Sequence, residues 1–387
     1  MSPSTHEPNL LYTDVEDSLR STVRDLLDDR CPAESVIALY DGDCSALVPL
    51  WQSLAVDLGL AGLLVPESLG GAGASAREAA VVLEELGRSV APVPFLTSAV
   101  VATAVLGFAG SGQVQGSAAA KLLSGLASGE RTAALAIPLS AGNAADVAVL
   151  ADVTADADGA LTGKVTSVAG ALEADVLLVP VAVLGDGGVV GGVEVHAVEA
   201  SNVTLTPVTS LDMSRQVADL AFDGAQSRVV VPAAAGEQAV RHALQLGAAL
   251  LASEQVGIAQ WCLDSTVAYL RERRQFGRVV GGFQALKHRL ADLYTVVEQS
   301  RAAARYAAAT AAEGHPDAEV AASVAQAYCA EVAVKAAEEC VQLHGGIGMT
   351  WEHPAHLYLK RAKADQIAFG SPTAHRSRLA ELADLPA

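Results

Sequence analysis

The sequence predicts an α+β protein built from a helical region, a β region and a second helical region, because three stretches of the chain differ in hydrophobic period. Apolar residues recur at helical spacing up to about residue 128. Short Val-, Leu- and Thr-rich runs divided by turn residues follow, and helical spacing returns after about residue 231. We therefore expect an N-terminal α-helical domain over 1–128, a middle antiparallel β-barrel or sandwich over 129–231, and a C-terminal α-helical bundle over 232–387.

The N-terminal region carries clear helix signals. Thr13 and Glu16 form a T-x-x-E capping box at the start of an apolar-periodic run that ends near Arg30. A turn-rich crossing, LAGLLVPESLGGAG, follows the second helix. After the first helix, the apolar spacing predicts three more helices, over residues 47–58, 76–87 and 94–106.

The middle region has a different pattern, with turn signals such as Asp158-Gly159 and Asp186-Gly187-Gly188 between apolar runs. Five runs predict strands: AALAIPL, ADVAVLADV, DVLLVPVAVL, VEVHAV and NVTLTPV. The final region predicts long helices joined by short loops, which is typical of a four-helix bundle. These helices are expected over residues 237–274, 282–312, 316–343 and 353–366.

Composition excludes several classes of protein. The formal net charge of −19 argues against nucleic acid as a partner. No apolar run reaches the roughly 18–20 residues that a membrane-spanning helix needs. The N-terminus lacks the basic and apolar parts of a secretory signal, so we expect a cytoplasmic protein. Five scattered cysteines without a C-x-x-C pattern favour reduced thiols, and we expect no metal site.

Charge is unevenly distributed along the chain. Between residues 141 and 200, nine acidic residues accompany one basic residue, Lys164. From Pro232 to the end, 15 Lys and Arg residues nearly balance 16 Asp and Glu residues. A phosphate-bearing ligand should therefore be held mainly by the C-terminal region.

The most informative segment spans residues 269–293, YLRERRQFGRVVGGFQALKHRLADL. We expect one helix to stop at Gly277, and a new helix to begin near Gly282 with Phe283 and Gln284 in its first turn. Guanidinium groups beside a fresh helix N-terminus suit a pyrophosphate. The alternative is that the arginines only complement the helix dipole. The last turn of the first helix holds Arg271, Arg273 and Arg274.

A second segment, residues 340–360, has the sequence CVQLHGGIGMTWEHPAHLYLK. A helix is expected to end at Gly345-Gly346, where the absence of side chains allows a ligand close to the backbone. Gln342 can pair with an adenine or ribose edge. A glycine pair after a helix is also an ordinary C-cap, so this segment alone decides nothing.

Together the two segments resemble the acyl-CoA dehydrogenase family. R-x-Q-F-G followed by F-Q, and then Q-x-x-G-G-x-G, match the two signatures of that family's C-terminal bundle. LVPESLGGAG, EELGR and APVPF match its N-terminal domain, and the α/β/α order matches as well. The ending HGGIGMTWEHPAHLYLKRAK is similar to an actinobacterial-type branch that forms heteromeric enzymes, some acting on steroid side-chain CoA thioesters.

The resemblance implies an FAD-dependent desaturation of an acyl-CoA thioester, with electrons passed on to an electron-transfer protein. In that family FAD lies between subunits of a tetramer, its ADP half on a neighbour's bundle and its flavin ring facing the β-domain. Arg273 would meet the pyrophosphate, and His344 has an alternative role as a capping or packing residue. The full set of implied cofactor residues is Arg273, Phe276, Phe283, Gln284, Gln342, Leu343, His344, Gly345 and Gly346.

The family's catalytic base is missing from the matching position. Desaturation needs a base for the α-proton while the flavin takes the β-hydride, and the usual base is the Glu of a Y-E-G-T motif. Here the matching stretch is QIAFGS, which places Phe369 at the Glu position. An alternative base position in some members falls on Gly247. A base contributes a factor of about 10²–10⁴ in rate, which an efficient enzyme cannot forgo. Because Phe369 and Gly247 cannot accept a proton, we assign no catalytic residue to this chain.

The middle region also departs from the family pattern. PLSAGNAAD and GKVTSVAGALEAD lack the flavin-facing T-E-x-x-x-G-S-D and W-x-x-T/S-N motifs. The best remaining carboxylate is Glu254, which is either a displaced base with a raised pKa or a structural residue bonded to a neighbouring helix. Glu352 and His353 suggest acid–base chemistry, but Glu is also simply favourable at a helix start.

Three hypotheses follow. The favoured one is a subunit of a heteromeric acyl-CoA dehydrogenase, expected as a tetramer, that gives the ADP half of the FAD site to a partner carrying the base. The second is a self-sufficient dehydrogenase whose base has moved, with Glu254 as the candidate. The third is a catalytically dead scaffold or binding subunit of the same fold.

Overall fold

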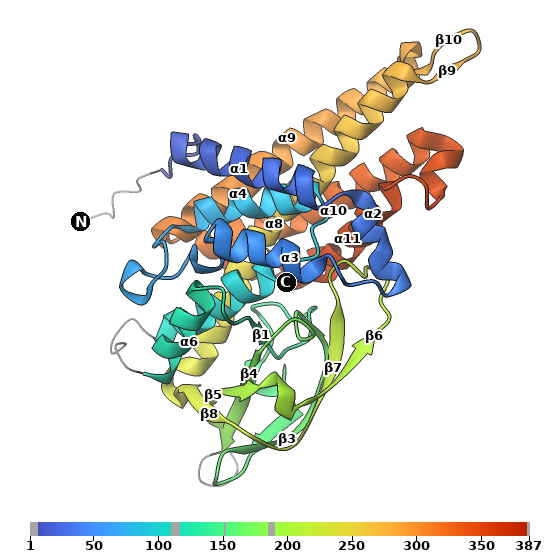
Figure 1. Ribbon diagram of the computed structural model, residues 1–387. Coiled ribbons are helices and arrows are strands. Elements are labelled where there is room, and N and C mark those ends of the chain that lie inside the picture. The colour runs from blue at the N-terminus through green and yellow to red at the C-terminus, as the bar shows by residue number, and fades with distance from the viewer. Residues whose placement is uncertain (1–6, 110–116, 151, 185–189, 385–387) are drawn as a thin grey trace.

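The structure is a computed structural model that describes residues 7–109, 117–150, 152–184 and 190–384. Helices from both ends of the chain pack together, and two β-sheets lie on one side of them (Figure 1). The α+β fold class expected from the sequence is therefore confirmed.

The N-terminal helices begin where the sequence places them. Thr13 caps the first helix through the expected capping box with Glu16, and Ser75 and Glu78 form a second one. The helices expected over 47–58 and 94–106 are present, although each contains a π-helical stretch. Two short helices, α2 and α6, were not predicted. The bounds are α1 Asp14–Arg30, α2 Ala33–Ala38, α3 Leu47–Gln52, α4 Ala76–Arg88, α5 Thr103–Ala109 and α6 Ala118–Ala127.

The β region forms two four-stranded sheets, with strand orders β1-β4-β5-β8 and β2-β3-β7-β6. All pairs in them are antiparallel except β1 and β4, which pair in parallel. Apolar side chains of both sheets, such as Leu177 and Phe222, share one core. The strands are β1 Ala133–Leu135, β2 Asp152–Ala155, β3 Ala160–Ala169, β4 Val176–Leu184, β5 Val190–Glu199, β6 Thr204–Val208, β7 Val217–Gln226 and β8 Arg228–Val231.

One strand prediction was wrong in part. Within the run ADVAVLADV, a short helix, α7 (Val147–Leu150), replaces the expected strand, and only Asp152 and Val153 belong to a strand, β2. The Asp146 side chain accepts a hydrogen bond from the Ala148 N–H at 3.1 Å, which caps a helical turn that apolar content alone does not reveal. Strands β3, β7 and β8 were not predicted, and the turn signal Asp186-Gly187-Gly188 lies outside the described residues.

The bundle matches the expected helices to within a few residues, with one added helix at the end. One boundary was wrong: α8 ends at Glu272 and Arg273 is its cap, so Gly277 does not end the helix. Gly277 instead has φ 73° in the turn of a small hairpin, β9 (Arg274–Gln275) and β10 (Arg278–Val279). The helices are α8 Ala233–Glu272, α9 Gln284–Glu313, α10 Ala318–His344, α11 Ala355–Ile367 and α12 Pro372–Leu382.

Glycine allows α4 and α8 to cross at backbone contact. A Cβ on Gly87 would lie 2.1 Å from the Glu254 carbonyl oxygen, and one on Gly257 would lie 1.9 Å from the Glu84 carbonyl oxygen. No larger residue fits at either position without moving a helix. The crossing ties the N-terminal helices to the centre of α8. In the part of the chain that is described, no helix has the length and apolar character needed to cross a membrane.

Candidate functional site

The first signature segment forms the exposed end of two long helices. Helices α8 and α9 extend together past the rest of the fold and are joined by the β9–β10 hairpin (Figure 1). At its turn, Phe276 is 88% exposed and has a left-handed φ of 53°. Its ring meets that of Phe283 edge-on at 6.1 Å, and the Arg278 guanidinium lies 5.1 Å from the Phe283 ring centre. An aromatic pair is thus held out in solvent beside cationic groups.

The arginines in and beside this hairpin make no ion pair with the described residues of their own chain. Each is exposed, and none forms a salt bridge with any carboxylate in the described parts of the chain. Their guanidinium donors are therefore available to an anion from outside the chain. The same stretch holds a single acid, Glu272, against Arg271, Arg273, Arg274 and Arg278.

The second signature segment lies next to the first. Helix α10 ends at His344, whose ring stacks on that of Tyr269 in the last turns of α8 at 4.5 Å. The chain then turns at Gly345, with φ 65°. Gln342 and Gly346 are exposed, and no heavy atom lies within 4 Å of where a Cβ would stand on Gly345 or Gly346. The positive φ by itself accounts for Gly345, whereas neither backbone conformation nor packing within the described parts of the chain accounts for Gly346.

His344 differs from the other residues of the implied cofactor set, because its side chain is buried. Its Nδ1 lies 2.7 Å from the Cys340 carbonyl oxygen, while its Nε2 is buried and has no partner among the described residues. The structure thus gives His344 the packing and capping contacts of its alternative role. The remaining implied residues with side chains, Arg273, Phe276, Phe283, Gln284, Gln342 and Leu343, are exposed or half-buried.

These groups fit the ADP half of FAD. Free guanidinium groups suit a pyrophosphate, exposed aromatic rings can pack on an adenosine, and the open glycine pair allows close approach to the backbone. The hairpin that carries the arginines and Phe276 projects away from the sheets formed by β1–β8 (Figure 1).

Phe369 occupies the position expected to hold a catalytic base. It is 5% exposed and has a left-handed φ of 54°, which is unusual for an aromatic residue. Its N–H donates to the Leu139 carbonyl oxygen at 2.9 Å. A Cβ on Gly247 would lie 3.1 Å from Cζ of the Phe369 ring. The two base positions inferred from the sequence therefore lie in contact, and an aromatic ring fills the space between them.

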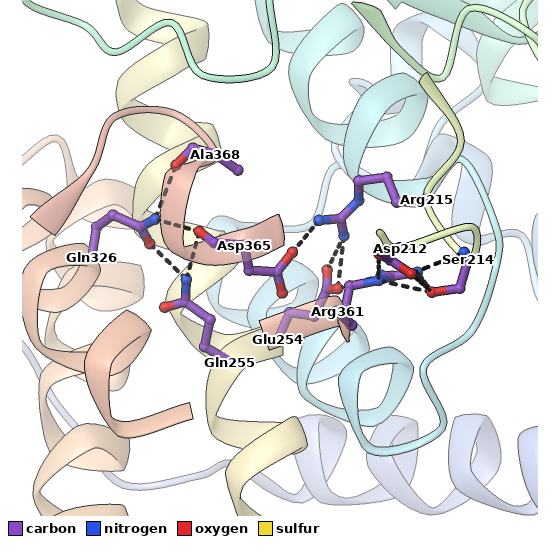
Figure 2. A network of polar contacts seen from close by, with 9 residues as sticks. All are labelled: Asp212, Ser214, Arg215, Glu254, Gln255, Gln326, Arg361, Asp365 and Ala368. Carbon is purple, nitrogen blue, oxygen red and sulfur yellow. Dashed lines mark hydrogen bonds and ion pairs between the residues drawn. The ribbon is translucent and has the colours of Figure 1, made fainter. Parts of the chain in front are cut away.

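Glu254 belongs to a buried ionic cluster formed by residues of α8, α11 and the loop before β7 (Figure 2). Its two carboxylate oxygens accept from Nη2 of Arg215 at 2.7 and 2.6 Å, and one of them also accepts from Nη1 of Arg361 at 2.6 Å. Arg215 comes from the loop before β7, and Arg361 from α11. Both arginine side chains are at most 9% exposed. This is the structural role that the sequence left open for Glu254.

The cluster contains one more carboxylate than guanidinium. Arg361 also bonds Asp212 at 2.8 Å, and Nη1 of Arg215 bonds Oδ1 of Asp365 at 2.5 Å. Burial, and then the nearby charge of Glu254, raise the pKa of Asp365 to about 8. Its Oδ2 is buried without a partner among the described residues, which suits a protonated oxygen. A neutral Asp365 leaves two carboxylates for two guanidiniums.

A glutamine pair fastens this cluster to the chain before Phe369. Gln326 of α10 donates from Nε2 to the carbonyl oxygens of Asp365 at 3.1 Å and Ala368 at 3.0 Å. Gln255 of α8 donates to the Asp365 carbonyl oxygen at 3.2 Å and to Gln326 at 3.1 Å (Figure 2). The end of α11 and the following turn are therefore held from both α8 and α10.

Comparison with known proteins identifies the family to which this architecture belongs. The models for "Acyl-CoA dehydrogenase, N-terminal domain" and "Acyl-CoA dehydrogenase, C-terminal domain" match residues 13–130 and 234–383, which together exceed half of the chain. The chain belongs to the acyl-CoA dehydrogenase family. This family consists of oxidoreductases whose cofactor is FAD, so the family, the enzyme class and the cofactor expected from the sequence are confirmed.

Relatives in the family include actinobacterial enzymes. Acyl-CoA dehydrogenase IpdE2 of Mycolicibacterium smegmatis is 32% identical over 362 residues, covering 93% of this chain and 96% of the relative. The solved ChsE4-ChsE5 complex from Mycobacterium tuberculosis is 29% identical with a TM-score of 0.82, covering 98% of this chain and 100% of that one. A solved variant of the Tcur3481-Tcur3483 steroid ACAD is 30% identical with a TM-score of 0.80, covering 96% and 98%. The similarity to heteromeric steroid-type members was expected from the C-terminal motif.

One acidic residue near the site of this acyl-CoA dehydrogenase was not singled out from the sequence. Glu173 follows β3, and its Oε2 is buried without a partner among the described residues. Burial raises the pKa of Glu173 to about 7. It lines a small polar cavity with Thr97 and Arg215. The run AGALEAD places this acid among small apolar residues, which was the only signal that pointed to it.

The pair Glu352 and His353 does not form an acid–base site. Glu352 is exposed, and no hydrogen bond or ion pair joins it to His353 in the described structure. His353 uses Nδ1 to accept the Ala355 N–H at 3.2 Å, as a capping residue does, and burial lowers the pKa of its imidazole to about 4.

Proposed function

We propose that this chain is one subunit of a heteromeric FAD-dependent acyl-CoA dehydrogenase, and that it lends the ADP half of an FAD site to a partner subunit carrying the catalytic base. The reaction is the α,β-desaturation of an acyl-CoA thioester, and an electron-transfer protein receives the electrons. The observation that carries this proposal is the contrast between the exposed arginine hairpin and the aromatic ring at the base position.

Unpaired cations support the first half of the proposal. Arg273 would hold the pyrophosphate with Phe276 packing nearby. Phe283 and Gln284 would lie along the adenosine, and the open turn at Gly345-Gly346 would receive its adenine end. Bound FAD supplies the acceptor for a hydride. The residues of this chain bind and orient its non-reacting half.

The absence of a free carboxylate at Phe369 and Gly247 supports the second half. A phenyl ring cannot take a proton, and Glu254 is held at both oxygens by Arg215 and Arg361. Abstraction of an α-proton needs a base within hydrogen-bond reach of the substrate. In this arrangement that base comes from the partner. Two solved relatives with two components, ChsE4-ChsE5 and Tcur3481-Tcur3483, agree with a two-chain enzyme.

The direct test compares the purified chain alone with the chain co-expressed with an acyl-CoA dehydrogenase subunit that retains the Glu. We expect FAD content and acyl-CoA-dependent reduction of an electron acceptor only in the co-purified complex. Full FAD content and turnover in a homotetramer of the lone chain would contradict the proposal.

A pair of arginine variants sharpens this test. Arg273→Ala should reduce the FAD affinity of the complex by about tenfold or more, because a charge-assisted hydrogen bond to phosphate contributes about 1.5–3 kcal/mol. Arg228→Ala is the matched control, since Arg228 is also exposed and free of ion pairs among the described residues but lies on β8. Equal loss of FAD in both variants would show that the hairpin is not part of the FAD site.

The alternative function is a self-sufficient dehydrogenase with a relocated base. The sequence made Glu254 the candidate base. The structure adds Glu173 as a second candidate, because its pKa is raised and one of its carboxylate oxygens has no partner among the described residues. Under this alternative, one of the two substitutions Glu173→Gln and Glu254→Gln removes the base. That variant should lose turnover and keep its flavin. Under the proposed function, Glu173→Gln should leave the turnover of the complex within about twofold of the parent.

A further inference from the structure

A narrow apolar cavity lies beside Phe369, where the three parts of the fold meet. Its volume is about 20 Å³, which is enough for about one water molecule. Thr97 and Val101 come from the N-terminal helices, Ile137 and Leu139 from the chain after β1, and Phe369 from the turn after α11. Apolar cavities at domain junctions are the usual places for small ligands, yet this one is too small for any acyl chain.

The Phe369 ring is what reduces the space. Its Cζ and Cε2 atoms lie 3.1 and 3.2 Å from where a Cβ would stand on Gly247 of α8, and Val101 Cγ2 lies at 3.2 Å from the same point. Any residue with a side chain at position 247 would press on the ring. The Phe369 ring therefore packs on Gly247, where only a residue without a side chain leaves room for it, and the two positions are complementary in size.

The backbone holds the ring in this place despite its conformation. A left-handed φ of 54° is costly for an aromatic residue, and such strain persists only where neighbours impose it. Three contacts do so: the Phe369 N–H donates to the Leu139 carbonyl oxygen at 2.9 Å, the Phe369 carbonyl oxygen lies 3.0 Å from Nε2 of His375, and Gln326 holds the Ala368 carbonyl oxygen at 3.0 Å. Hydrogen bonds to the backbone before and after the Phe369 Cα thus fix the position of the ring.

We infer that Phe369, seated on Gly247, fills the acyl-binding space of this subunit, so that acyl chains are excluded from it and bind only in the partner. This inference rests on the proposed function, because it takes the position of Phe369 as the place where an active subunit meets the acyl group. The ligand excluded is an apolar acyl chain, as the Val, Ile and Leu lining indicates. Removal of the ring should uncover a latent acyl pocket.

Binding of a non-CoA acyl thioester to the full chain without a partner tests the inference. The probe is the octanoyl thioester of N-acetylcysteamine, titrated calorimetrically into wild type and Phe369→Gly. Glycine is chosen because it accepts the left-handed φ without strain. We expect saturable binding to Phe369→Gly at least about tenfold tighter than to wild type, since burying only two methylene groups already yields that factor.

Phe222→Ala is the matched control. Phe222 is 3% exposed, but it lies in the core between the two sheets, away from the junction, so its loss should create no acyl binding. Binding of the probe to wild type as tight as to Phe369→Gly would overturn the inference, and so would a folded Phe369→Gly that binds no probe. Should Phe369→Gly not fold, Phe369→Leu replaces it: tighter binding than wild type supports the inference, and equal binding overturns it.

A double-mutant cycle at Gly247 gives a second, ligand-free test. Gly247→Ala places a methyl group against the ring and should lower the thermal midpoint of the wild type. In the Phe369→Gly background the same methyl group enters vacated space and should leave the midpoint unchanged or raise it. Additive effects would mean that the ring does not sit on Gly247. Neither experiment depends on FAD or turnover, so failure here is distinguishable from failure of the heteromer proposal, which is measured by FAD content.

Discussion

Two groups of arginines in this protein occupy opposite environments. Arg215 and Arg361 are buried and bonded to carboxylates, whereas Arg271, Arg273 and Arg274 are exposed and form no ion pair among the described residues. A buried guanidinium without partners would cost several kcal/mol, so the first group can exist only as part of a complete cluster. An exposed arginine has no such requirement and keeps its donors for another molecule.

The difference separates residues that hold this chain together from residues that serve a second one. The buried pair connects the loop before β7 to α8 and α11, and so fixes the turn that carries Phe369 (Figure 2). The hairpin arginines contribute nothing comparable to their own chain. Substitutions in the two groups should therefore act on different measurements.

The largest effect is expected from Arg361→Ala. Its removal leaves Asp212 buried without a guanidinium partner and Glu254 with Arg215 alone, which should lower the free energy of unfolding by about 3–5 kcal/mol. Urea denaturation of the lone chain measures the change. Arg271→Ala is the control, and it should change the value by no more than about 0.5 kcal/mol. A loss below about 1 kcal/mol for Arg361→Ala would show that the cluster is not what joins the domains.

A pH-dependent effect is expected from Asp365→Asn. The raised pKa of Asp365 means that the folded chain holds a proton which the unfolded chain releases above about pH 4. The resulting stability is complete below that pH and is lost as pH rises toward about 8. The slope is about 1.4 kcal/mol per pH unit for one proton.

The asparagine variant cannot release this proton, so its stability relative to wild type should rise steadily between about pH 5 and pH 8. Thermal midpoints across that range give the comparison. Parallel pH profiles for the two proteins would mean that Asp365 is charged in the folded state and that the cluster carries a net negative charge.

The smallest effect on stability is expected in the hairpin. Arg273→Ala and Arg274→Ala should leave the free energy of unfolding of the lone chain within about 0.5 kcal/mol of wild type, because exposed side chains without partners contribute little. Urea denaturation is again the measurement. A clear loss of stability would show that these arginines act within their own chain, and would weaken the case for an FAD site shared between subunits.

Local signals accounted for most helices, because caps and apolar spacing act over a few residues. Thr13 and Glu16 marked the start of α1, and the bundle helices lie within a few residues of their expected ranges. Strands were harder. β3 and β7 contain polar and glycine residues, and they form strands because they pair with each other. The run at α7 has the composition of a strand, but the Asp146 cap favours a helix there.

The candidate site divides in the same way. Arg273 and the glycine pair were found by motif, and their exposure follows from their place at helix ends. The burial of His344, the two arginines that hold Glu254, and the unpartnered oxygen of Glu173 depend on segments distant in sequence. No spacing rule within one segment predicts such contacts.

By itself the sequence determined the α/β/α order, the family and the absence of a carboxylate at Phe369 and Gly247, since each is a matter of local pattern or residue identity. Only the tertiary structure decided that these two positions touch, that the Phe369 ring lines the narrow cavity between the domains, and that the hairpin arginines form no ion pair among the described residues while the buried ones do. Contact and burial depend on how distant segments pack, and that information is spread over the whole chain rather than written in any one stretch of it.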